Sequence, residues 1–237
     1  MHSRFIDQFE VILLDMAHTF MFNVDRFSDD EDFAATYQQI GGRALSTNKV
    51  RQILKSLFAT IESDYQDPRF IECFPSVCSY LETQASSRSL PRNELDLLEQ
   101  VFALHEVGKI PEAYAETLCQ LRKTHRLGVV SDIWSRSDLF LQEFDRVGIR
   151  ELFDVIVFSS DHGCVKPSSQ LFRKALDAFA VDRTRLIFVG DSLQRDVAGA
   201  KAVGLATVWV NAAGAAPVEE RLKPDCLIRE LLELCER

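Results

Sequence analysis

The sequence has no apolar run long enough to cross a membrane and no pair of cysteines in a C-x-x-C arrangement. Its apolar stretches fall well short of the roughly 18 residues that a spanning helix needs. The N-terminus, MHSRFIDQFEV, lacks the apolar segment and the small-residue cleavage site of a secretory signal. The six scattered cysteines are typical of reduced thiols. We therefore expect a cytoplasmic protein that does not associate with membranes.

The sequence also lacks an excess of basic residues. Its 36 acidic and 27 basic side chains give a formal net charge of −9. Because binding to nucleic acid or anionic lipid relies on basic patches, this balance argues against both kinds of partner. Hydrophobic residues make up 46% and charged residues 27%, as in ordinary globular proteins. The 237 residues are enough for a core domain with a smaller insert.

Short apolar runs rich in β-branched residues recur along the chain without polar alternation. Such runs are typical of strands that are covered on both faces of a parallel sheet. Helical patterns lie between them, and Gly148 and Gly204 stand where a helix would end in a left-handed turn. The apolar runs cover residues 11–14, 127–131, 154–160, 186–191 and 206–211. This alternation predicts an α/β fold with a doubly wound, Rossmann-like parallel sheet.

One region breaks this alternation. Residues 25–105 contain no run that resembles a buried strand, and helical patterns take its place. Ser28, which is followed by acidic residues, and Ser46, which precedes an apolar-periodic run, have the character of helix N-termini. We predict an α/β core of residues 1–24 and 106–237, interrupted by an α-helical subdomain of residues 25–105.

Polar residues follow the predicted strands at the points where the strands end. They are Asp15, Ser131, Lys166, Asp191 and Asp196. In open α/β sheets, ligands bind in the crevice at the carboxyl ends of the strands. Any one of these residues alone would more often be part of a turn or a helix cap. Together, in register along one edge of the sheet, they predict a binding site.

These residues resemble the four motifs of the haloacid dehalogenase superfamily, whose members use an aspartate nucleophile. The first motif, D-x-D-x-T, is similar to DMAHT at residues 15–19, with one departure. The second, a Ser or Thr after an apolar strand, is matched by Ser131, and the third, a Lys often followed by Pro, by Lys166. The fourth, G-D-S-x-x-x-D-x-x-G-A, is matched in full by residues 190–200. The helical insert lies where the family has its cap.

The resemblance implies a hydrolase that acts on a small phosphorylated metabolite through an aspartyl-phosphate intermediate. Asp15 would be the nucleophile. Lys166 would neutralise both Asp15 and the phosphoryl oxygens, because a carboxylate that attacks a phosphate dianion needs positive charge beside it. Ser131 would donate a hydrogen bond to a phosphoryl oxygen.

The resemblance also implies Mg²⁺ as the cofactor, a hard cation that prefers oxygen ligands. Its protein ligands would be the carboxylates of Asp15 and Asp191 and the backbone carbonyl of Ala17. Asp196 would hold the water molecules bound to the metal or orient the groups beside it, without binding the metal itself. Thr19 would order the loop behind Asp15.

Ala17 is the departure from the pattern, since the family places its general acid/base at this position. Loss of a positioned acid/base typically costs about 10²–10⁴ in rate. In one interpretation the substrate has a leaving group that needs little protonation, or another residue supplies the proton. His18 is the nearest candidate for that role, because imidazole suits proton transfer near neutral pH.

Two other interpretations stay open. The phosphonoacetaldehyde hydrolase branch also has Ala here and cleaves a C–P bond with the help of a cap lysine, and Lys49, Lys55 and Lys109 are the cap-side lysines of this chain. Alternatively, the chain is a weak or inactive relative that binds a phosphorylated ligand or a partner protein. Dehalogenation is disfavoured by Asp191 and Asp196, since the dehalogenases of the family do not need a metal-binding fourth motif.

Overall fold

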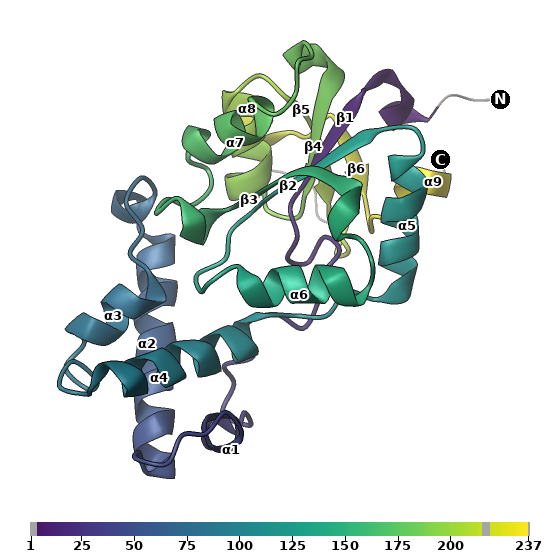
Figure 1. Cartoon of the computed structure of the whole chain (residues 1–237). Coiled ribbons are helices and arrows are strands. Elements are labelled where there is room, and N and C mark those ends of the chain that lie inside the picture. Colours follow the sequence, from purple (N-terminus) through teal and green to yellow (C-terminus); the bar gives the residue numbers. More distant parts are fainter. Residues whose placement is uncertain (1–3, 215–218, 237) are drawn as a thin grey trace.

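The computed structural model describes residues 4–214 and 219–236 (Figure 1). Its centre is a six-stranded parallel sheet with the strand order β3-β2-β1-β4-β5-β6. The strands are β1 (Val11–Leu14), β2 (Arg126–Ser131), β3 (Phe153–Phe158), β4 (Leu186–Gly190), β5 (Ala206–Val210) and β6 (Cys226–Ile228). This order is that of a doubly wound nucleotide-binding-type sheet, so the predicted fold class is confirmed.

Helices cover both faces of the sheet, which explains why its strands show no polar alternation. Ile12 and Leu14 of β1 belong to one apolar cluster, and Val11 and Leu13 belong to another on the opposite face. The first cluster includes side chains of α5 (Glu112–Arg122), α6 (Asp138–Arg146) and α9 (Glu233–Glu236). The second includes side chains of α7 (Ser169–Leu176) and α8 (Ala198–Ala202).

Two core helices end at the glycines that were predicted to adopt a left-handed turn. Gly148 follows α6 with φ of 72°, and Gly204 follows α8 with φ of 83°. Both lie in the left-handed region, where glycine has no Cβ to clash. Strand β6 was missed because it has three residues, of which Leu227 is exposed.

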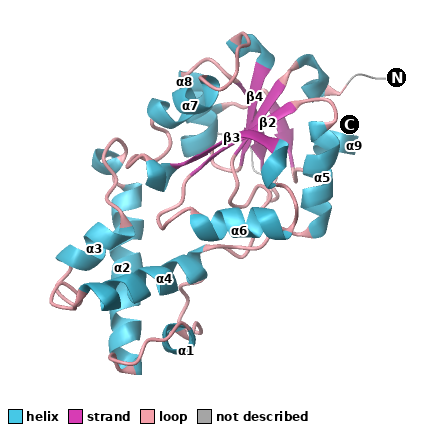
Figure 2. Cartoon of the chain, viewed as in Figure 1, coloured by secondary structure: helices cyan, strands magenta, loops and turns pink. Residues whose placement is uncertain are grey.

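Helices of the insert lie together at one side of the sheet (Figures 1 and 2). They are α1 (Phe33–Gln39), α2 (Thr47–Gln66), α3 (Val77–Thr83) and α4 (Arg92–Glu106). They bury an apolar cluster of their own, to which α2 contributes residues at helical spacing: Val50, Ile53, Leu54, Leu57 and Ile61. The division into a core and a cap at residues 24/25 and 105/106 stays a prediction.

The helix starts of the insert agree with the prediction in one case of two. Ser46 caps α2, and its hydroxyl accepts the Lys49 N–H at 3.3 Å. No helix begins at Ser28. Helix α1 begins at Phe33, because the Asp32 carboxylate caps it by accepting the Ala35 N–H at 3.0 Å. Helix α3, seven residues long, was too short for its pattern to be recognised.

Two chain segments join the insert to the core and lie side by side. Phe22 and Lys109 exchange backbone hydrogen bonds of 2.7 and 2.8 Å, and the Asp25 N–H donates to the Glu106 carbonyl at 3.0 Å. A second contact joins the insert to the segment before Lys166, where the Val165 N–H donates to the Ile71 carbonyl at 2.9 Å. Among residues 4–214 and 219–236, no helix combines the length and apolar character needed to span a membrane.

Candidate active site

The predicted site residues converge at the carboxyl edge of the sheet. Asp15 directly follows β1, Ser131 ends β2 and Asp191 directly follows β4. The Ser131 hydroxyl donates to Asp15 Oδ1 at 2.8 Å. Ser131 is completely buried behind Asp15, so in this structure its hydroxyl orients the carboxylate rather than facing open space.

Lys166 is the buried cation of this cluster. Its Nζ donates to Asp15 Oδ1 and to Asp196 Oδ1, both at 2.6 Å. Burial alone would lower the pKa of the Lys166 amine, but the Asp15 and Asp196 carboxylates outweigh burial and raise it above its ordinary value. The amine is therefore a permanent positive charge beside the predicted nucleophile.

Asp196 reaches the cluster from a π-helical turn, Leu193–Val197, that follows β4. Its second carboxylate oxygen accepts the Ser192 N–H at 2.9 Å, and its side chain is completely buried. A Cβ at position 190 would lie 2.4 Å from Asp196 Oδ2, so the glycine of the fourth motif lets this carboxylate approach the end of the strand.

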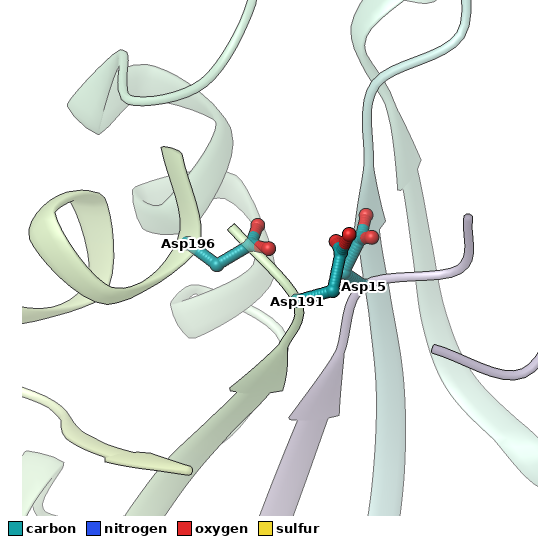
Figure 3. Close-up of side chains that lie close together, drawn as sticks. All are labelled: Asp15, Asp191 and Asp196. Atoms are coloured by element: carbon teal, nitrogen blue, oxygen red, sulfur yellow. The ribbon is translucent and has the colours of Figure 1, made fainter. Parts of the chain in front are cut away.

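Asp15, Asp191 and Asp196 each offer an oxygen within 4.8 Å of the others. Figure 3 shows the Asp15 and Asp191 carboxylates side by side, with Asp196 directed toward them. Burial and the neighbouring Asp15 charge raise the pKa of Asp191 to about 8, and burial raises the pKa of Asp196 to about 7 despite the Lys166 ammonium. Ionising three carboxylates beside one ammonium is therefore unfavourable, and a divalent cation bound between them would stabilise their ionised forms.

The loop after β1 is a tight turn around one carbonyl. The Met16 carbonyl accepts the N–H groups of Thr19, Phe20 and Met21 at 2.9–3.2 Å. In the described part of the chain, no N–H group donates to the Ala17 carbonyl, so this oxygen is available to a cation. Thr19 is buried, and its hydroxyl has no hydrogen-bond partner among the described residues.

A cavity of about 250 Å³ opens beside this cluster, between the sheet edge and the insert. We call the part formed by Asp15, Lys166, Asp191 and Asp196 the core wall. We call the part formed by Asp25, Tyr65 and Glu106, which lie on or next to the insert, the cap-side wall. Ala17 and His18 also line the cavity, and His18 is exposed.

A polar network joins the two walls. The Tyr65 hydroxyl donates to Asp132 Oδ2 at 2.8 Å, and Asp132 Oδ1 accepts the Lys166 backbone N–H at 2.9 Å. The Arg195 guanidinium lies 3.3 Å above the Tyr65 ring and donates to the backbone carbonyls of Tyr65 and of Lys166. The insert residue Tyr65 is thereby tied to the loop that carries Lys166.

The cap-side wall holds two carboxyl groups at the joint between insert and core. Glu106, the last residue of α4, is buried, and its two oxygens accept the N–H groups of Trp134 at 2.5 Å and Ser135 at 2.9 Å. Asp25 has φ of 52° and an exposed side chain that lines the cavity. Partial loss of water around its carboxyl group and the charges of Glu106 and Glu62 raise the pKa of Asp25 to about 8.

Sequence reasoning missed the residues of the cap-side wall and of the network. Asp132 offered a signal, since it directly follows Ser131 at a strand end. Arg195 stands at a variable position of the fourth motif, and Tyr65 lies on α2 of the insert without a motif around it. The three cap-side lysines lie elsewhere: Lys55 binds the Phe27 carbonyl and Asp29, Lys109 pairs with Glu143, and Lys49 is half-buried on α2. The cavity-lining lysine is Lys166.

Comparison with known proteins identifies the family. Residues 96–210 match the model of the haloacid dehalogenase-like hydrolase family. A glyceraldehyde 3-phosphate phosphatase from Pyrococcus abyssi is 30% identical over 179 residues, which cover 72% of this chain and 73% of that protein. The chain belongs to the haloacid dehalogenase-like hydrolases. The resemblance seen in the motifs, and the prediction of a hydrolase, are thereby confirmed at the level of the family.

Other relatives of this haloacid dehalogenase-like hydrolase match over less of their length. A pyrimidine 5'-nucleotidase from Escherichia coli is 31% identical over 122 residues, and the chain spans about half of it, 53%. The fold is also that of a phosphatase of the family from Thermococcus onnurineus, with a TM-score of 0.64, 22% identity and coverage of 96% of both chains. At that identity the likeness concerns the fold.

Proposed function

We propose that this protein is a phosphatase that hydrolyses a small phosphorylated metabolite, with Asp15 as the nucleophile. The observation that supports the proposal most strongly is the buried cluster at the sheet edge. In it, the carboxylate of Asp15 is held by the Ser131 hydroxyl at 2.8 Å and the Lys166 ammonium at 2.6 Å. The cluster lines a cavity at the edge where α/β sheets bind ligands.

The core wall suits an attack on a phosphate ester. Asp15 would form a bond to phosphorus through one carboxylate oxygen, giving an aspartyl-phosphate that water then hydrolyses. The Lys166 ammonium would offset the repulsion between this carboxylate and the phosphate dianion. Ser131 would hold Asp15 in one orientation before the substrate binds, and its single O–H would turn from Asp15 to a phosphoryl oxygen that comes within its reach.

The donor set of the core wall fits Mg²⁺. All of its candidate ligands are oxygens, and the three carboxylates within 4.8 Å of one another carry more negative charge than Lys166 neutralises. Asp15, Asp191 and the Ala17 carbonyl would hold the ion, with Asp196 in support. When bound, Mg²⁺ would supply charge neutralisation at the phosphoryl oxygens.

The cavity favours a small substrate. Its volume of about 250 Å³ is smaller than the roughly 300–1,000 Å³ typical of pockets for drug-sized ligands. The Lys166 ammonium and the Arg195 guanidinium line it, and they would face an anionic ligand. The phosphatase and nucleotidase names of the relatives point to the same substrate class. A Schiff-base route finds no support, because Lys49, Lys55 and Lys109 do not line the cavity.

The experiment is phosphate release from a panel of alkyl phosphomonoesters, nucleoside monophosphates and acetyl phosphate, with Mg²⁺ or with EDTA. The wild-type protein should release phosphate from at least one compound, and EDTA should abolish the release until Mg²⁺ is restored. Asp15→Asn should lower the rate by roughly 10⁴-fold or more, as loss of a nucleophile does in other hydrolases. Asp30→Asn, a change at an exposed aspartate of the insert, is the matched control.

The proposal fails if the wild-type protein releases no phosphate from any compound, or if Asp15→Asn keeps the wild-type rate. Tight binding of a phosphorylated compound without turnover would instead identify the protein as a phospholigand-binding relative. Turnover that is insensitive to EDTA would remove Mg²⁺ from the proposal and leave the Asp15 step.

A further inference from the structure

The core wall leaves no residue over to deliver a proton to a leaving alkoxide, since Asp15 is the proposed nucleophile and Asp191 and Asp196 are the proposed holders of Mg²⁺. The side chain at position 17 is a methyl group, and Lys166 is held between two carboxylates. An alkoxide is a poor leaving group unless it is protonated as the P–O bond breaks. If the proposed phosphatase reaction acts on alkyl phosphates, the proton therefore has to come from another residue that lines the cavity.

Asp25 is free to take that role. It lines the cavity together with Ala17 and Asp15, and the residue is exposed. Its backbone is fixed in a left-handed conformation by the bond from its N–H to the Glu106 carbonyl at 3.0 Å. No hydrogen bond or ion pair engages its carboxyl group among residues 4–214 and 219–236, so both oxygens are available to a ligand.

The surroundings of Asp25 favour its protonated form. Glu106 at the end of α4 and Glu62 on α2 face it with like charge, and no cation pairs with Glu106 in the described ranges. Glu106 keeps its own place by accepting two backbone N–H bonds from Trp134 and Ser135. Desolvation and these charges raise the pKa of Asp25 and so favour its proton-bearing form.

We propose that the Asp25 carboxyl is the general acid and base of this active site, in the role that position 17 does not fill. This inference rests on the proposed phosphatase function. In the first step an Asp15 oxygen bonds to phosphorus, the bond from phosphorus to the substrate oxygen breaks, and that oxygen takes the Asp25 proton and leaves as an alcohol. In the second, a water oxygen bonds to phosphorus, its proton returns to Asp25, and the bond to Asp15 breaks to release hydrogen phosphate.

Other proton carriers of the cavity are less suitable. The Glu106 oxygens are occupied by the Trp134 and Ser135 N–H groups. Asp132 accepts from Tyr65 and from the Lys166 N–H. His18 lines the cavity and is exposed, but no carboxylate orients its ring among the described residues. His18 therefore enters the test as a competing variant.

The test compares Asp25→Asn with the wild-type protein on two substrates. The first is the alkyl phosphomonoester that the wild-type protein hydrolyses fastest, and the second is acetyl phosphate, whose leaving group needs little protonation. The rate of phosphoenzyme formation should fall about 10²–10³-fold for the alkyl ester. For acetyl phosphate it should change less than about tenfold. A role in folding alone would lower both rates to the same extent.

Three further variants complete the test. Asp30→Asn changes an exposed carboxylate of the insert that lies outside the cavity lining, and it should leave both rates within about twofold. The double variant Ala17→Asp/Asp25→Asn should react with the alkyl ester at least about tenfold faster than Asp25→Asn does. His18→Asn should change the rates on the alkyl ester and on acetyl phosphate by the same factor.

This inference is wrong, while the phosphatase function stands, if Asp25→Asn lowers the rates on both substrates equally or lowers neither. It is also wrong if His18→Asn, and not Asp25→Asn, lowers the rate on the alkyl ester alone. Absence of phosphate release from the wild-type protein would overturn both.

Discussion

The carboxylates on the two walls of the cavity differ in their ion-pair partners. On the core wall, Asp15 and Asp196 both contact the Lys166 ammonium at 2.6 Å. On the cap-side wall, Asp25 and Glu106 lie near each other, and neither forms an ion pair within the described part of the chain. A carboxylate beside a cation is held ionised and in one geometry. A carboxyl group beside another carboxylate keeps its proton to a higher pH.

This difference separates two tasks of a phosphate-transferring site. The core wall is built to hold a nucleophile ionised and oriented, since Asp15 has the Lys166 ammonium and the Ser131 hydroxyl as fixed partners. The cap-side wall is built to keep a carboxyl group protonated and without a protein partner. Substitutions that disturb each wall should therefore act in opposite directions on stability, and three of them are considered below in order of expected size.

The largest effect should come from Lys166→Met. Removing one partner of a buried ion pair leaves uncompensated charge, which costs about 3–5 kcal/mol in other proteins. We expect the free energy of unfolding, measured by urea denaturation at pH 7.5, to fall by about that amount. The rate of phosphate release should fall at least about 10²-fold, because Asp15 then faces the phosphate without the ammonium.

Lys174→Met is the matched control for this substitution, because Lys174 is exposed on α7. Its effect on unfolding should stay below about 0.5 kcal/mol. If Lys166→Met is no more destabilising than this control, the carboxylates of the core wall do not depend on the lysine for their charge balance.

The core wall could be predicted from the sequence because each of its residues directly follows a strand or stands in a contiguous motif. Asp15 ends a run of four buried residues, and Asp191 and Asp196 belong to one eleven-residue motif. The strand edges then bring these segments together through the parallel pairing of β1 with β2 and with β4. A local pattern and one rule about sheet edges were sufficient for this part.

The cap-side wall could not be predicted in this way. Asp25 and Glu106 lie 81 positions apart in the sequence, and they meet only because the two connecting segments pair through their backbones. Backbone pairing of irregular segments leaves no hydrophobic period to read. Tyr65 is a further case, since it sits on a helical face that packs inside the insert and its hydroxyl still reaches Asp132 at 2.8 Å.

A smaller effect is expected where the two walls are joined. Arg195→Lys keeps the charge but removes the planar group that stacks 3.3 Å from the Tyr65 ring and donates to the Lys166 carbonyl. We expect the free energy of unfolding to fall by about 1–2 kcal/mol, and kcat/KM to fall about tenfold as Lys166 loses its support. Urea denaturation and steady-state kinetics measure the two effects.

Arg173→Lys, at an exposed position of α7, is the control for the loss of a guanidinium. Equal behaviour of the two variants would show that the walls are not coupled through Arg195. A loss of stability with unchanged kcat/KM would show that the network holds the insert without positioning Lys166.

The smallest effect, and one of opposite sign, should come from Asp25→Asn on stability. The pKa of Asp25 is raised in the folded state, from 3.8 to about 8, by burial and by the Glu106 charge. Its favourable contribution is therefore complete below about pH 4 and is lost as the pH rises toward 8. Asn carries no charge, so the variant should match the wild type near pH 4 and exceed it at pH 9. Since the Asp25 side chain is exposed to the water of the cavity, screening should keep the gain below about 1 kcal/mol.

Glu143→Gln gives the contrast for this measurement. Burial would raise the pKa of Glu143, but hydrogen bonds from Arg146 and from the Ile110 N–H outweigh it and lower the pKa to about 2. Its contribution is present above about pH 4.5 and is lost as the pH falls toward 2, so Glu143→Gln should destabilise the protein at neutral pH. Thermal unfolding of both variants between pH 4 and 9 would therefore diverge in sign. A fall in stability for both at pH 9 would mean that Asp25 is stabilised by a partner, and its carboxyl would not be free for proton transfer.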